Sequence, residues 1–121
     1  MKPILAVLAT LGALMTNSAV AKDDHSANYY LPGCRDFADR HAALEPFQQG
    51  ECVGILEGLA TLAPDAPFSV SRSCVPDDIT LIQMTTVVVG WFDQHPQRWN
   101  ENFMALAGFA LHDAWPCPSK Q

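Results

Sequence analysis

Four cysteines are the residues of this 121-residue chain whose chemistry is most readily stated. An even number of cysteines predicts two disulfide bonds when a chain reaches an oxidising compartment. Zinc coordination is an alternative, but zinc sites favour close pairs such as C-x-x-C, and consecutive cysteines here stand at least 18 positions apart. A cysteine nucleophile paired with a histidine would leave one cysteine over. We therefore expect disulfides at Cys34, Cys52, Cys74 and Cys117.

The other polar residues form no recognisable catalytic pattern. The sequence contains no P-loop, G-x-S-x-G, H-E-x-x-H or dinucleotide-binding motif. His112 and Asp113 are neighbours in sequence, and adjacent residues of a helix do not face each other. Asp77 and Asp78 are explained as helix caps, where a carboxylate accepts hydrogen bonds from free backbone N–H groups. We therefore expect a protein that is not an enzyme, with no metal, no cofactor and histidines at the surface.

The segment from Trp91 to Trp99 combines aromatic residues, an arginine and a proline between two helical stretches. Trp and Arg are enriched at the energetic centres of protein interfaces, and loops carry recognition more often than helix interiors do. Trp91 and Phe92 are also explained as core residues that close the domain. The segment predicts a partner-binding turn that carries Asp93, Gln97, Arg98 and Trp99.

The charge balance limits the class of partner. Seven basic residues stand against 13 acidic ones, which gives a formal net charge of −6. Nucleic acids and anionic membranes need clustered Lys and Arg, so we expect neither as a partner. An acidic surface favours a protein or a cationic group, and a homodimer is also open.

The first 21 residues have the pattern of a secretory signal peptide. Lys2 precedes an apolar run at 4–15, and Ala19–Ala21 is a small-residue cleavage site. A transmembrane helix needs about 20 apolar residues, more than this run supplies. We expect export, cleavage before Lys22, and no membrane association afterwards. Export is also the condition under which the four cysteines form disulfides.

The exported part is expected to be all-α, a small disulfide-bonded domain of about four helices at 34–117. An N-terminal tail at 22–33 precedes it and ends in a turn at Pro32-Gly33. Apolar residues recur at helical spacing in the stretches that follow. Helices are predicted over 34–44, 52–62, from Asp77-Asp78 toward Pro96, and over 98–114, with a loop at 63–73.

Two features of these helices admit more than one interpretation. The run Thr85–Val89 alone has strand propensity, but the helical pattern continues for about five turns around it. Gly54 and Gly58 lie one turn apart, so another backbone could approach them closely. A membrane dimer motif needs a longer apolar span than this one, so close packing inside the domain is the preferred explanation.

The pairing of the cysteines is not settled by the sequence. If the last two helices are antiparallel, Cys74 before them and Cys117 after them lie at the same end. This arrangement favours Cys74–Cys117 and Cys34–Cys52. The other two connectivities are Cys34–Cys117 with Cys52–Cys74, and the crossed pattern.

An ordered set of landmarks resembles the Rap/Tai immunity family. The resemblance covers 34 to 117, and it departs from the family at Ile55, where an aromatic is usual, and at Asp77-Asp78, where a glycine is usual. The landmarks are Gly50-x-Cys52-x-Gly54-x-x-x-Gly58, Cys74-Val75-Pro76, a long apolar helix ending in His95-Pro96, and Ala114-Trp115-Pro116-Cys117.

The resemblance implies a periplasmic function. Known members of this family bind and block peptidoglycan-amidase effectors of type VI secretion, which implies a cognate amidase as the protein partner. A second function class is a periplasmic stress chaperone of the small acid-activated type, which is also small, helical and disulfide-linked. Such a chaperone would expose apolar surface at low pH.

Overall fold

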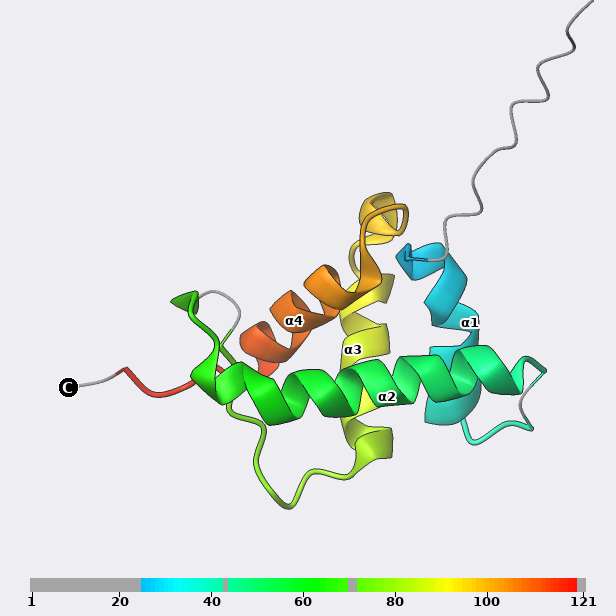
Figure 1. The fold of residues 1–121 in the computed structure, drawn as a ribbon. Coiled ribbons are helices and arrows are strands. Elements are labelled where there is room, and N and C mark those ends of the chain that lie inside the picture. Colours follow the sequence, from blue (N-terminus) through cyan, green and yellow to red (C-terminus); the bar gives the residue numbers. More distant parts are fainter. Residues whose placement is uncertain (1–24, 43, 70–71, 120–121) are drawn as a thin grey trace, which may run out of the picture.

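The computed structural model describes residues 25–42, 44–69 and 72–119, and the expected signal peptide lies outside them. The described residues contain no strand beyond two isolated bridges, Ser26–Asn102 and Ser73–Pro116. The all-α class and the helix at Thr85–Val89 are therefore confirmed. The helices are α1 (Ala27–Ala38), α2 (Pro46–Leu62), α3 (Leu81–Asp93) and α4 (Phe103–Ala114), with 3-10 turns at Ala63–Asp65 and Pro96–Arg98 (Figure 1).

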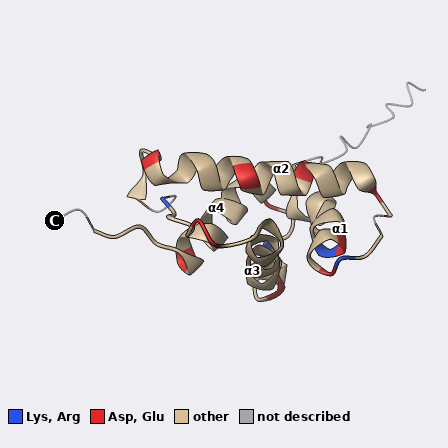
Figure 2. Ribbon diagram, turned by 90° about the horizontal axis from the view of Figure 1, so that it is seen from below, with Lys and Arg blue, Asp and Glu red and all other residues tan. Residues whose placement is uncertain are grey.

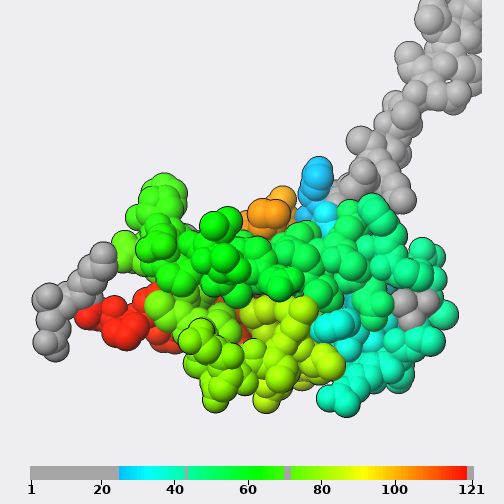
Figure 3. Space-filling model, turned by 60° about the horizontal axis from the view of Figure 1, so that its bottom comes forward, coloured from blue at the N-terminus to red at the C-terminus, as the bar shows by residue number. Residues whose placement is uncertain are grey.

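Helix α2 is the longest of the described helices, and it lies across the other three (Figure 1). Viewed from below, α2 forms one layer, with α1 and α3 beneath it (Figure 2). The space-filling view shows α2 as a continuous ridge across the molecule (Figure 3). None of the helices in the described ranges is both long enough and apolar enough to cross a membrane.

The core lies between α2 and the other helices, and aromatic rings form its centre. The Phe92 and Phe103 rings stack with centroids 5.4 Å apart, and the Tyr30 ring lies 4.9 Å from Phe103. These rings join α1, α3 and α4. The largest fully buried side chains are Phe92, Phe103, Leu56, Leu106, Leu111 and Val88.

Helix α1 begins earlier than the sequence predicts. The turn expected at Pro32-Gly33 is wrong, because both residues lie inside α1, and the second half of the expected tail at 22–33 is helical from Ala27. A proline inside a helix removes a backbone hydrogen bond and is costly. Burial offsets this cost along one helical stripe, formed by Ala27, Tyr30, Leu31 and Cys34.

Gly33 explains how closely α1 approaches α2. A Cβ atom at Gly33 would lie 2.5 Å from the carbonyl carbon of Gln48, so only glycine fits there. The glycine that permits close backbone packing is therefore Gly33. The packing role expected for Gly54 and Gly58 is wrong, because a Cβ at either position meets nothing within 4 Å.

Three helix starts also differ from the prediction. Helix α2 begins at Pro46, where proline's fixed φ suits the first turn. Helix α3 is capped by Thr80 rather than by Asp77 or Asp78: Thr80 and Gln83 exchange side-chain and backbone hydrogen bonds in a capping box. Helix α4 begins at Phe103, after its cap Asn102, and not near Arg98.

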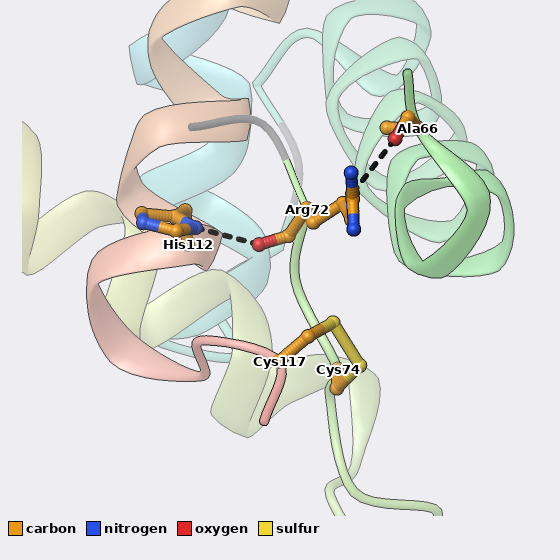
Figure 4. The surroundings of a disulfide bond; sticks show 5 residues. All are labelled: Ala66, Arg72, Cys74, His112 and Cys117. Atoms are coloured by element: carbon orange, nitrogen blue, oxygen red, sulfur yellow. Dashed lines mark hydrogen bonds between the residues drawn. A yellow bond between two sulfur atoms is a disulfide. The ribbon is translucent and has the colours of Figure 1, made fainter. Parts of the chain in front are cut away.

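Both expected disulfides are present, and their connectivity is Cys34–Cys52 and Cys74–Cys117. The first joins α1 to α2 and is fully buried. The second joins the segment before α3 to the segment after α4 (Figure 4). The Cys74 N–H also donates to the carbonyl of Trp115 at 2.8 Å, so a backbone bond reinforces this closure.

Candidate partner-binding site

The four residues predicted to bind a partner lie in or beside the segment 94–102 between α3 and α4, which we name the α3–α4 turn, but their side chains have different surroundings. Asp93, the last residue of α3, accepts two hydrogen bonds from the Arg35 guanidinium of α1, at 2.5 and 3.2 Å. These hydrogen bonds lower the pKa of the Asp93 carboxyl. Asp93 therefore fastens the start of the turn to α1.

Trp99 lies at the other end of the turn and is half-buried. Its indole Nε1 donates to the carbonyl of Phe92 at 2.8 Å, and its own carbonyl accepts from the Asn28 N–H at 2.8 Å. The Arg35 guanidinium lies 5.6 Å from the centre of its ring. Trp99 therefore ties the turn to α1 and α3.

Arg98 faces away from Asp93, toward α4. Its guanidinium donates two hydrogen bonds of 2.8 Å to the Glu101 carboxylate, which raise the pKa of Arg98 and lower that of Glu101. It also lies 5.8 Å from the Trp91 ring centre and 5.9 Å from that of Phe109. Gln97 is exposed beside it. Gln97 and the Arg98–Glu101 pair are therefore accessible on this side of the turn, whereas the exposed Asp93 is paired with Arg35.

A shallow hollow of about 590 Å³ adjoins Arg98 and contains two histidines. The His95 ring stacks on Trp91 with centroids 4.0 Å apart, and its Nδ1 lies 2.7 Å from the Trp91 carbonyl oxygen. His112 Nδ1 lies 2.6 Å from the carbonyl oxygen of Arg72 (Figure 4). Both imidazoles are therefore engaged with backbone carbonyls, and the described residues contain no group of three or more metal-ligating side chains.

The turn and its surroundings thus provide a polar and aromatic contact surface that contains two ion pairs. Residues 16–117 match the family described as Rap1a immunity proteins. The chain belongs to the Rap1a immunity protein family. Neither a curated protein nor a solved structure matches it.

This Rap1a-family chain has a second surface, outside the residues predicted to bind a partner. An apolar depression separates α2 from α4, and we name it the α2–α4 groove. Leu62 and Met104 lie on its walls and are 73% and 51% exposed. The residues that define the groove are Gly54, Ile55, Gly58, Leu59, Leu62, Met104, Ala105 and Gly108.

The signal for this groove was present in the sequence of the Rap1a-family chain. Gly50, Gly54 and Gly58 recur every four residues and therefore lie on one face of α2. This periodicity shows that the three residues share a face, but it does not show whether that face points inward. The open space around each of them answers the question: the face points outward.

Proposed function

We propose that this protein is a periplasmic immunity protein that binds and blocks a peptidoglycan-amidase effector of type VI secretion. The observation that carries the proposal is membership of the Rap1a immunity family over residues 16–117. An immunity protein binds a protein effector, so its function is stoichiometric capture rather than turnover. The signal-peptide pattern and the two disulfides support a location outside the cytoplasm.

We further propose that the α3–α4 turn contacts the effector. Gln97 and the Arg98–Glu101 pair supply the direct contacts, since they are accessible and, unlike Asp93 and Trp99, do not hold the turn against α1. Asp93 and Trp99 hold the turn in place through Arg35 and the Phe92 carbonyl. The acidic net charge of −6 would speed association with a basic surface, an effect that weakens as salt is added.

The proposal is tested by coexpressing the exported protein with a candidate amidase encoded beside its gene. Protection from lysis and a 1:1 complex by calorimetry are the expected results. Gln97→Ala with Arg98→Ala should weaken binding while the circular dichroism spectrum is unchanged. Asp77→Asn, an exposed change away from the turn, is the matched control. Absence of both protection and binding would contradict the immunity function.

A periplasmic stress chaperone is the second candidate function. The exposed Phe47, Leu62 and Phe68 side chains favour it, because a chaperone binds clients through apolar surface. An acid-activated chaperone would bind the dye ANS more strongly and lose fixed packing as the pH falls. It would also suppress aggregation of unrelated client proteins at low pH, which an immunity protein has no reason to do. Both measurements therefore separate the two candidates.

A further inference from the structure

The α2–α4 groove is large enough to accept a segment of another protein. It consists of two adjoining hollows of about 440 and 610 Å³, which share Leu59, Leu62 and Met104 as walls. Leu62 and Met104 expose apolar side chains that a partner would remove from water. From Glu51 to Leu62 the groove follows three turns of α2, about 17 Å at 1.5 Å per residue. This length suits a partner helix of about three turns.

Glycines keep the groove open on both sides. Gly54 and Gly58 line it from α2, and Gly108 lines it from α4. Apart from its own turn of helix, a Cβ atom added at any of the three would meet no described atom within 4 Å. Glycine is therefore not required there by the fold of the described residues. What glycine provides is room for another backbone to approach α2 and α4 closely.

The charges around the groove define the chemistry of that partner. Glu51 lines one hollow and Asp65 lines the other, and no Lys or Arg lines either. Helix α2 contains no Lys or Arg at all, and its acidic residues are spaced along it (Figure 2). Arg35 and Arg98 are engaged in ion pairs elsewhere. The groove is therefore apolar along its length and acidic toward its ends.

A second copy of this chain fits the groove poorly. Two copies packed groove to groove about a two-fold axis would place the carboxylates of Glu51 and Asp65 from both copies in one interface, with no cation among the lining residues to offset the repulsion. A helix from a different protein fits better. Its apolar face would cover the apolar length of the groove, and Lys or Arg residues flanking that face would pair with the acidic residues toward the ends of the groove.

We propose that the α2–α4 groove binds an apolar helix flanked by Lys or Arg residues, contributed by the effector. The effector as donor rests on the proposed function, whereas the chemistry of the helix rests on the groove alone. An amphipathic helix docked in an apolar groove is a common mode of recognition. The groove then acts as a second contact surface beside the α3–α4 turn, and it begins at Asn102 and Met104, just after that turn.

The first experiment needs no effector. Two capped helical peptides serve as probes, KLAALLKALLAALK and its counterpart with every Lys replaced by Glu. We expect the Lys peptide to shift the amide NMR signals of Gly54, Gly58 and Gly108 and the Glu peptide to bind at least tenfold more weakly. Equal binding of the two peptides, no binding, or shifts confined to other residues would overturn the proposal.

Variants then test the groove itself. Gly58→Leu fills the groove and should weaken binding of the Lys peptide at least tenfold. Thr61→Leu is the control, because it adds the same side chain to α2 on the face toward Pro76 and Ile79, where a separate hollow lies. Glu51→Gln with Asp65→Asn should weaken binding severalfold and reduce its salt dependence. Unchanged affinity in Gly58→Leu would overturn the proposal.

Two further measurements separate the possible occupants. By sedimentation, a dimer of the unmutated protein that Gly58→Leu dissociates would make the groove a self-interface and overturn the proposal. With the candidate amidase, Gly58→Leu should bind at least tenfold more weakly than Thr61→Leu. Equal binding of both would overturn the groove as the effector site but leave the immunity function standing. An amidase that binds no form of the protein would instead contradict the immunity function. The peptide experiment would still test whether the groove binds an apolar helix flanked by Lys.

Discussion

The Arg35 guanidinium of α1 and the Asp93 carboxylate at the end of α3 form a two-pronged ion pair, with Nη2 and Oδ1 2.5 Å apart. The two residues are 58 positions apart in sequence. Their side chains are 35% and 49% exposed, so solvent screens their attraction. The pair therefore serves mainly to fix where the α3–α4 turn lies against α1.

We predict that this ion pair contributes modestly to stability. A double-mutant cycle with Arg35→Gln and Asp93→Asn should give a coupling free energy of about 0.2–1 kcal/mol by urea unfolding at neutral pH, the range of exposed pairs. Asp77→Asn with Arg35→Gln is the control pair and should show additivity. A coupling well above 1 kcal/mol would mean that the pair is less screened than its exposure indicates.

The same pair predicts a pH dependence with a definite sign. Hydrogen bonds from Arg35 lower the pKa of Asp93 in the folded protein. A lowered pKa stabilises the fold above the ordinary pKa of about 3.9, and this contribution is lost as the pH falls through the folded value. Asp93→Asn should therefore lower the free energy of unfolding at pH 7 and have little effect near pH 2. A larger effect in acid than at pH 7 would contradict this sign.

Helix caps offer a direct comparison between the sequence prediction and the structure. Thr80→Ala removes the hydrogen bond to the Gln83 N–H and should lower the free energy of unfolding by about 1 kcal/mol. Asp77→Ala and Asp78→Ala should change it by less than about 0.5 kcal/mol, as exposed substitutions away from a cap do. Thermal or urea unfolding measures all three. A loss of stability in Asp77→Ala or Asp78→Ala, with none in Thr80→Ala, would instead support the sequence prediction that an aspartate caps this helix.

Replacing glycine by alanine should change the free energy of unfolding in opposite directions at two helical positions. Gly54→Ala should raise the free energy of unfolding by about 0.5–1 kcal/mol, because alanine favours a helix and its methyl group enters open space. Gly33→Ala should lower it, because the methyl would lie 2.5 Å from the Gln48 backbone. Melting temperatures compare the two variants directly. Equal changes in melting temperature for the two variants would show that α1 and α2 can move apart at little cost in free energy.

The two disulfides should differ in their accessibility to reductant. Cys34 and Cys52 are fully buried, whereas Cys74 and Cys117 are partly exposed, and Cys117 lines a surface hollow. Mild dithiothreitol followed by alkylation and peptide mapping should label Cys74 and Cys117 first. The loop-entropy relation assigns about 4 kcal/mol to the 43-residue closure and about 3 kcal/mol to the 18-residue one. Earlier labelling of Cys34 would contradict the expected order.

The helical stripes and the presence of two disulfides could be predicted, because local spacing determines the first and an oxidising compartment the second. The pairing of the cysteines was only favoured, because it depends on how the helices lie against one another. The start of α1 could not be predicted, because Pro32 and Gly33 have strong local turn preferences that are overridden by the buried stripe of α1 and by contact with Gln48. The cap at Thr80 was missed because Asp77 and Asp78 are equally good caps by residue type. Only the observed start of α3 at Leu81 shows that Thr80, and neither aspartate, is the cap.

In the candidate site, too, the residue types could be predicted from the sequence but the contacts between distant residues could not. Residue types marked the α3–α4 turn, but they could not show that Trp99 is hydrogen-bonded to Phe92 or that Asp93 is paired with Arg35. These contacts join distant parts of the chain, and no local pattern encodes them. The outward direction of Gly54 and Gly58 likewise depends on where α1, α3 and α4 lie relative to α2.

The order of the two disulfides along the chain has a consequence for how the protein is made. Cys34–Cys52 and Cys74–Cys117 close two covalent rings that follow one another without overlap. A chain that emerges N-terminus first therefore reaches its native connectivity when each cysteine joins the next one to appear. Nothing has to be reshuffled later. The link at 53–73 belongs to neither ring, so a single cut there would leave two closed pieces held together by noncovalent contacts alone, among them the Arg35–Asp93 ion pair and the packing of α1 against α3.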